Sequence, residues 1–379
     1  MTTYTVKDIP PASFFSKPVF LDDNFIIVAP EMPFSEEIRK LLLDWDFKEL
    51  HSEGVQIAAA VKPETTEETS PLENSTLSDG LLVKRAEEFY LSFQKYVETL
   101  FTRIAIKGDV DFKSVAEKVK GICEIVKEDR RFLLRAIKTA DSGNTDNFLA
   151  AHAIKSAIIS IVIGVYIKLP NHRLIELGVA ALLHEIGMIK LPPQIYLAKR
   201  QLSPQERKAI LTHPILSFNM LKSFDFPLTI SLAALEHHER EDGTGYPQKL
   251  TGDKISLYAK IIAVACSYEA ITSARPHKDA NDGYVGMLDL LKNVGKQYDD
   301  TIVRALVYSL SIYPIGLYVM LSNGRKGQVV DVNPENPRFP IVQLFGENTP
   351  DGKVKTIETS PTGISIVRPL MREEMDPKK

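Results

Sequence analysis

Seven of the eight histidines fall within one stretch of helical sequence between Asn147 and Ser311, and five of the seven form a regularly spaced series. Four of these positions stand on separate predicted helices, about one helical hairpin apart, and the fifth histidine is adjacent to the fourth. Only a bundle that brings several helix segments to one point can place all five rings together. The pattern therefore predicts a mainly α-helical core around a cluster of imidazoles. The five are His152, His184, His213, His237 and His238.

Carboxylates accompany these histidines. Glu185 directly follows His184, and Glu239 directly follows the adjacent histidine pair. Imidazole and carboxylate ligands suit divalent iron, manganese or zinc. A pair of such ions a few ångströms apart serves phosphoryl-transfer chemistry. A single histidine is more often an ordinary core or surface residue, so the spacing alone leaves a metal site and a metal-free core equally open.

Composition limits the class of protein. The 379 residues suffice for two or three domains, and the 44% apolar and 25% charged fractions are those of an ordinary globular protein. The formal net charge of −3 provides no global basic field, so we expect neither a nucleic acid polymer nor a membrane as partner. The longest apolar stretch, Ala157–Ile167, is too short to span a bilayer and predicts a buried core helix. An N-terminus without a signal-peptide pattern, together with two widely separated cysteines, predicts a cytoplasmic protein.

The N-terminal part of the chain predicts a small α/β module in residues 1–61. It contains a predicted strand at Phe25–Ala29, a predicted helix at Pro33–Phe47 and a second predicted strand at Val55–Val61, an order that fits a βαβ-like unit. No phosphate-binding loop or paired acidic cluster indicates what the module does.

Residues 62–80 are polar and acidic, which predicts a linker. Helical patterns at 81–106 and 111–140 then predict a helical lead-in over residues 81–144. These helices either pack on the core or form a dimerising stalk, so a homodimer is left open.

The sequence becomes rich in β-forming residues after Tyr313-Pro314. Leu317–Leu321 and Gly327–Val332 flank a turn sequence and predict a hairpin, and shorter strands are expected at 341–345 and 363–367. Residues 316–379 therefore predict a small β extension that follows a helical domain at 145–315.

Four short motifs follow one another along this helical domain. They are His-Glu-Ile-Gly at 184–187, His-Pro at 213–214, His-His-Glu-Arg with Asp-Gly-Thr-Gly-Tyr-Pro over 237–247, and Ala-Ile-Thr-Ser-Ala-Arg-Pro at 270–276. In this order they resemble the HD-GYP family of cyclic di-GMP phosphodiesterases, within the HD superfamily of metal-dependent phosphohydrolases. The resemblance covers roughly residues 145–315, a little under half of the chain.

The resemblance implies a helical bundle that holds metal ions, usually iron or manganese, where a water attacks phosphorus and opens the cyclic dinucleotide. It implies that the five histidines, Glu185 and Cys266 stand at metal-ligand positions. It assigns Tyr246 and Pro247 to the substrate-binding loop that gives the family its name. It also makes Arg275 and Lys278 the basic pair that holds phosphate, a role that suits a bidentate guanidinium.

Several positions depart from the family's catalytic pattern. Glu185 replaces an aspartate and extends the carboxylate by about 1.5 Å. Met188 stands where the family has a lysine, and Lys190 is the remaining candidate cation, although a helix would turn it to a different side. Cys266 replaces a metal-binding aspartate, as either a thiolate ligand or a small buried side chain. Phe148 stands where a glutamate would help hold a third metal, so we expect two divalent ions at most, iron or manganese, with zinc as the alternative.

Two functions follow from these features. The first is a phosphodiesterase that converts cyclic di-GMP to linear pGpG, GMP or both through a dinuclear site, with Glu185 and Lys190 as catalytic residues. The second is a catalytically degenerate cyclic di-GMP receptor that signals to a partner protein through its N-terminal module. A phosphohydrolase for another nucleotide fits the specific GYP loop less well, and a purely structural role does not explain five histidines in this order.

Overall fold

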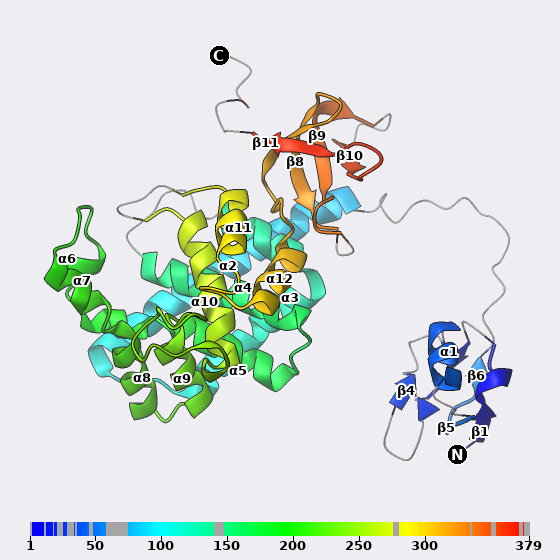
Figure 1. Cartoon of the computed structure of the whole chain (residues 1–379), viewed down its shortest axis with the longest axis horizontal. Helices are drawn as coiled ribbons and strands as arrows, with labels where there is room; N and C mark the ends of the chain where they lie inside the picture. Colours follow the sequence, from blue (N-terminus) through cyan, green and yellow to red (C-terminus); the bar gives the residue numbers. More distant parts are fainter. Residues whose placement is uncertain are drawn as a thin grey trace. The chain divides into compact units, whose positions relative to one another are not determined.

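The computed structural model describes two compact units, residues 1–73 and 74–379, and each is considered by itself (Figure 1). The described residues are 2–10, 13–17, 19–20, 26–28, 34, 36–44, 48–57, 75–139, 148–275, 280–333, 336–349, 354–370 and 374.

The N-terminal unit is a small antiparallel α/β module. Strands pair in the order β1-β5-β3-β4, and β2 pairs with β6 in a second sheet. The predicted βαβ-like unit is wrong, because β4 and β6 lie in different sheets and the described pairs are antiparallel. The polar strand β5, which lies between α1 and β6 in the sequence, has no strong β-forming pattern. In the sheet it lies between β1 and β3 and pairs with both. The elements are β1 (Thr2–Thr5), η1 (Val6–Asp8), β2 (Phe14–Phe15), β3 (Val19–Phe20), β4 (Ile26–Val28), α1 (Glu36–Asp44), β5 (Glu49–Ser52) and β6 (Gln56–Ile57).

The second unit begins with a helical hairpin of α2 (Ser75–Lys107) and α3 (Phe112–Thr139). Buried side chains recur along α2 every three or four residues, as an amphipathic helix requires: Tyr90, Phe93, Val97, Leu100, Phe101 and Ile104. Gly108, with φ +68°, turns the chain between the helices. The helix starts inside the predicted linker at 62–80, of which residues 62–74 lie outside the described residues.

Helix α4 (Phe148–Tyr166) is the central element of this unit. It packs against α5 (Asn171–Leu183), α10 (Leu257–Thr272) and α12 (Asp300–Leu310), as well as the hairpin. By length and composition α4 could cross a membrane, but 78% of its apolar window is buried inside the unit. It is therefore the core helix that the apolar stretch predicts.

The remaining helices of this unit are short and follow one another between α5 and α12, apart from α10 (Figure 1). A capping box between Ser203 and Glu206 starts α7, and Asp282 and Asp299 cap α11 and α12. These elements are η2 (Ile186–Lys190), α6 (Pro193–Tyr196), α7 (Pro204–Ile210), α8 (His213–Ser223), α9 (Leu228–Glu236), η3 (Gly252–Lys254) and α11 (Gly283–Lys292).

The chain ends in an antiparallel sheet with strand order β10-β9-β8-β7-β11. The predicted hairpin is present as β7 and β8, with Gly324 at φ +78° in its turn. An ion pair of 3.1 Å between Arg131 on α3 and Asp331 on β8 joins the sheet to the helices. The expected architecture, a helical core with a small N-terminal α/β module and a C-terminal β extension, is confirmed. The strands are β7 (Tyr318–Leu321), β8 (Lys326–Asp331), β9 (Ile341–Asn348), β10 (Val354–Glu358) and β11 (Ile366–Pro369).

Candidate metal centre

The five histidines of the sequence pattern meet in the interior of the helical unit. His152 lies within α4, whereas the other four lie at helix ends: His184 caps the C-terminus of α5, His213 begins α8, His237 caps the C-terminus of α9, and His238 follows it. The first four are at most 3% exposed. Helix ends suit this purpose because their side chains can turn inward from several directions without interrupting a helix.

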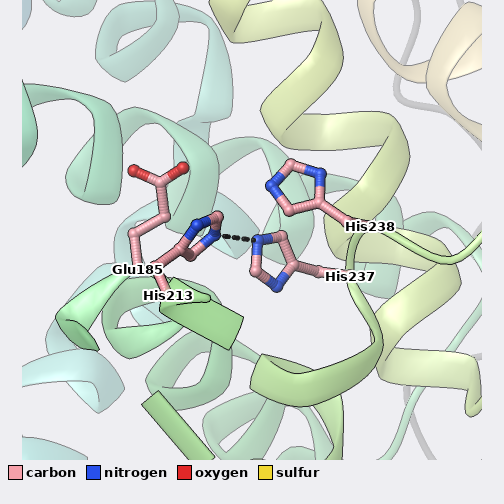
Figure 2. Close-up of side chains that lie close together, drawn as sticks. All are labelled: Glu185, His213, His237 and His238. Carbon is pink, nitrogen blue, oxygen red and sulfur yellow. Dashed lines mark hydrogen bonds between the residues drawn. The ribbon is translucent and has the colours of Figure 1, made fainter. Parts of the chain in front are cut away.

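These side chains form two groups that share one carboxylate. Glu185, His213, His237 and His238 offer ligand atoms within 4.8 Å of one another, and so do His152, His184 and Glu185. Figure 2 shows the first group: Glu185 follows α5, His213 begins α8, and the adjacent His237 and His238 come from the end of α9. Glu185 belongs to both groups, so its carboxylate could contribute a ligand atom to each of two ions.

Three of the rings are oriented in the same way by the backbone. The Nδ1 atoms of His184, His213 and His237 lie 2.7, 2.8 and 2.9 Å from the carbonyl oxygens three residues earlier. A carbonyl only accepts, so each Nδ1 carries the proton and donates it. Each neutral ring therefore presents an unprotonated Nε2 to the cluster, which is the form that binds a metal.

The Nε2 atoms of His184, His213 and His237 accept no hydrogen bond from a donor among the described residues, and each could bind a metal ion. The Nε2 atom of His184 is buried and has no hydrogen-bond partner among the described residues. The Nε2 atoms of His213 and His237 lie 3.2 Å apart (Figure 2), although the backbone contacts leave neither with a proton in the neutral form. Buried polar atoms normally find partners, so a divalent cation with nitrogen ligands fits this site.

Burial keeps most of these rings neutral. Desolvation lowers the pKa of His184 to about 4 and also lowers the pKa values of His213, His237 and His238. For His152, burial acts in the same direction, but the carboxylates of Glu269 and Glu185 outweigh it and leave the pKa raised.

Glu185 is ionised in this setting. Burial opposes its ionisation, but the rings of His152, His184 and His213 hold the carboxyl pKa well below its usual range. Its Oε1 lies 3.7 Å from Nε2 of His152. The residue falls between α5 and η2, where the backbone leaves helical geometry.

A close backbone approach brings this segment to His213. The amide of Gly187 donates to Oγ of Ser217 on α8 at 2.9 Å. A Cβ at position 187 would lie 2.4 Å from the carbonyl oxygen of His213, so only glycine permits this packing.

The Gly-Tyr-Pro loop is anchored beside the same cluster. The buried carboxylate of Glu239 accepts from the amides of Gln248 at 2.6 Å and Leu250 at 2.9 Å. The amide of Tyr246 donates to the carbonyl of His238 at 3.2 Å, and the two rings stack with centroids 4.7 Å apart. Pro247 follows through a cis peptide bond. Tyr246, one of the two loop residues predicted to contact substrate, thus lies against a predicted metal ligand.

The other predicted site residues are placed differently. Cys266 is buried but belongs to neither group of ligand atoms in the part of the chain that the structure describes. Its thiol donates to the carbonyl of Ala263 at 3.6 Å, and burial raises its pKa to about 12. Met188 is packed in the hydrophobic core, and Lys190 is exposed at the end of η2. Lys278 lies outside the described residues.

Glu269 is a member of this region that the sequence pattern did not single out. It is 3% exposed on α10, and its Oε2 contacts Nδ1 of His152 and lies 3.6 Å from Nη2 of Arg275. Burial opposes its ionisation, but His152 and Arg275 lower its pKa to about 2. Its position one helical turn after Cys266 could have indicated that it points the same way.

Comparisons with known proteins agree with this geometry. Residues 144–302 match the HD domain family. Cyclic di-GMP phosphodiesterase PA4108 from Pseudomonas aeruginosa is 30% identical over 303 residues, which cover 78% of this chain and 70% of that protein. Cyclic di-GMP phosphodiesterase PdeB from Borreliella burgdorferi is 29% identical over 227 residues, 58% of this chain and 60% of PdeB. The response regulator RpfG from Xanthomonas campestris pv. campestris, also named a cyclic di-GMP phosphodiesterase, is 34% identical over 177 residues, 46% of either chain.

A solved structure supports the fold. The HDG"Y"P protein Bd1817 from Bdellovibrio bacteriovorus superposes with a TM-score of 0.50 at 17% sequence identity, covering 80% of this chain and 97% of that one. The chain spans less than two thirds of the length of PdeB and RpfG. The resemblance carried by the four motifs is confirmed, and the chain belongs to the HD-GYP family of HD domain proteins.

Proposed function

We propose that this protein is a metal-dependent phosphodiesterase that hydrolyses cyclic di-GMP to linear pGpG, GMP or both in the cytoplasm. The observation that carries the proposal is the sharing of Glu185 between two groups of buried ligand atoms. The substrate is inferred from the printed names of the relatives PA4108, PdeB and RpfG.

The ligand atoms suit two divalent ions, iron or manganese in preference to zinc. His152, His184 and Glu185 would hold one ion, and Glu185, His213, His237 and His238 would hold the other. Such a pair supplies Lewis acidity toward phosphate and lowers the pKa of water. The three backbone carbonyls keep the Nε2 atoms of His184, His213 and His237 unprotonated, and the buried surroundings strengthen each electrostatic interaction.

The substrate would be held at the edge of this cluster. The guanidinium of Arg275 is 25% exposed and can donate two parallel N–H groups to a phosphate. Lys278 is proposed as its basic partner, and the Tyr246-Pro247 loop as a wall beside His238. Glu185 is the proposed catalytic carboxylate, and Lys190 is proposed to protonate the leaving oxygen from the exposed end of η2.

A receptor without turnover is the second candidate. Its support is the placement of Met188 in the core and of the Cys266 thiol on a backbone carbonyl, because neither adds charge to the cluster. Such a receptor would bind cyclic di-GMP and signal to a protein through the N-terminal unit.

One multiple-turnover assay separates the candidates. Protein purified without oxygen and loaded with iron(II) or manganese(II) is incubated with excess cyclic di-GMP, and the nucleotides are quantified by chromatography. We expect product beyond one equivalent, lost in His184→Ala and His237→Ala and retained in His172→Ala, which removes an exposed imidazole from α5. Retention of unchanged cyclic di-GMP by the metal-loaded protein would instead establish the receptor.

A further inference from the structure

Among the described contacts, three of the five cluster histidines have a backbone carbonyl on Nδ1, and His152 has a carboxylate there instead. In His184, His213 and His237 the Nδ1 atom faces a carbonyl oxygen, whereas Nδ1 of His152 faces Oε2 of Glu269. His152 lies within α4, where the carbonyls of the preceding turn are already used by the helix. A side chain from another helix therefore has to orient this ring.

Arg275 completes a short chain of contacts. Its Nη2 lies 3.6 Å from Oε2 of Glu269 and 3.4 Å from Nδ1 of His152. Nδ1 cannot donate to the carboxylate and accept from the guanidinium at once, and a guanidinium has no acceptor. The carboxylate is the stronger partner for both, so Nδ1 of His152 donates to Glu269 and the guanidinium forms an ion pair with the same carboxylate. Nε2 of the neutral ring is then unprotonated and lies 3.7 Å from Glu185.

Glu269 is built into the fold as a fixed anion. Its side chain is 4% exposed. Where α10 ends, the amide of Ser273 donates to the backbone carbonyl of Glu269 at 2.9 Å. The segment after this helix end leads directly to Arg275. One carboxylate thus contacts both a predicted metal ligand and the predicted phosphate-binding arginine.

We propose that Glu269 is a positioning residue that orients His152 for metal binding and links that ligand to Arg275. The inference rests on the proposed function of the histidine cluster. A carboxylate that accepts from the distal nitrogen of a ligating imidazole fixes the tautomer and raises the basicity of the ring. Through the same carboxylate, a phosphate that draws Arg275 away would change the charge next to His152.

Manganese(II) affinity, measured by chelator competition without nucleotide, tests the first part. Glu269→Gln keeps the shape and removes the charge, and we expect about 10- to 100-fold weaker binding. Glu269→Asp should recover part of the loss because it restores the charge with a shorter reach. Glu176→Gln, which removes a carboxylate that accepts from Tyr258 on α10, is the matched control and should bind as wild type does.

The outcomes separate this inference from the proposed function. Wild-type manganese affinity in a folded Glu269→Gln variant, checked by circular dichroism, would overturn the role of Glu269 even if cyclic di-GMP is hydrolysed. Weakened affinity supports it even if the protein proves to be a receptor. If Glu269→Gln does not fold, the comparison of Glu269→Asp with wild type decides the same question.

A mutant cycle tests the link to Arg275. If Arg275 acts through Glu269, Arg275→Gln changes manganese affinity in the wild-type background and leaves it unchanged in Glu269→Gln. If Arg275→Gln changes the manganese affinity by the same factor in both backgrounds, Arg275 does not act through Glu269 and that part of the proposal is wrong.

Discussion

The Nε2 atoms of His213 and His237 lie 3.2 Å apart, although the Nδ1 atom of each ring already donates to a backbone carbonyl. Without a proton between them, the two lone pairs face each other in a buried space. A cation bound between the rings would satisfy both lone pairs, whereas burial lowers both pKa values and opposes the uptake of a proton. The site is therefore sensitive to metal and to pH.

Metal binding should stabilise the protein, because the ions bind the folded state. At a manganese concentration 100 times the dissociation constant, the gain is about 2.7 kcal/mol. We expect the melting temperature to rise on adding manganese(II) and to return with a chelator. His213→Gln should abolish most of the rise, whereas the exposed His172→Ala should keep it. An equal rise in both variants would place the stabilising ion elsewhere.

In the chelated protein, stability should fall as the pH drops from 7 toward 5. Burial lowers the pKa of His184 to about 4 and also lowers the pKa values of His213, His237 and His238. As the pH falls below the ordinary histidine pKa of about 6.5, these rings take up protons in the unfolded chain before they do so in the folded protein, and the free energy of unfolding decreases. The raised pKa of His152 opposes this, because its contribution is fully present below 6.5 and lost as the pH rises through its folded value.

Urea unfolding at pH 7 and pH 5 measures the balance. His184→Gln removes one group with a lowered pKa, so the difference in free energy of unfolding between the two pH values should shrink. The exposed His172→Gln provides the control. A larger stability at pH 5 than at pH 7 would contradict the expected neutral state of the buried rings.

The site residues that belong to short sequence motifs could be predicted from the sequence. Helical periodicity predicted the bundle, and the family resemblance carried by the motifs indicated the five histidines and Glu185 that meet in it, together with Cys266, which belongs to neither group of ligand atoms in the described residues. The role of Glu269 was missed because its contact with His152 spans 117 positions and depends on how α10 packs on α4. The N-terminal topology was also missed, because strands as short as β2 and β6 are paired by tertiary contacts and not by local pattern.

Gly187→Ala should destabilise the protein and disturb the cluster. The added Cβ would meet the carbonyl oxygen of His213 at 2.4 Å and the amide nitrogen of Ser217 at 2.6 Å, and backbone atoms cannot give way easily. Overpacking of this kind costs about 1–3 kcal/mol in free energy of unfolding. Gly121→Ala within α3 meets nothing within 4 Å, so it should instead stabilise by up to about 1 kcal/mol through helix propensity. Thermal or urea unfolding of both variants decides whether contact or propensity governs.

Cys266→Ala should leave the number of bound metals unchanged. The thiol donates to the carbonyl of Ala263, and burial raises its pKa to about 12, so it is neutral at pH 7. The test measures the number of metal ions bound per protein in wild type, Cys266→Ala and His237→Ala after the same loading. Cys266 is the neutral neighbour in this comparison, and His237 is the predicted ligand. Loss of one metal equivalent from Cys266→Ala would show that the metal-bound protein uses a thiolate here.

Met188→Lys should destabilise the protein without improving catalysis. Met188 is 6% exposed and belongs to the hydrophobic core, although family resemblance aligns it with a lysine. An ammonium at this position would lose its hydration without a matched anion, which costs several kcal/mol or forces the side chain out of the core. Met188→Leu, which preserves volume, should cost less than about 1.5 kcal/mol. Unfolding free energies and initial rates of cyclic di-GMP hydrolysis for the two variants test this. A folded Met188→Lys protein with a higher rate than wild type would show that η2 can turn position 188 toward the cluster, and that the native methionine limits turnover.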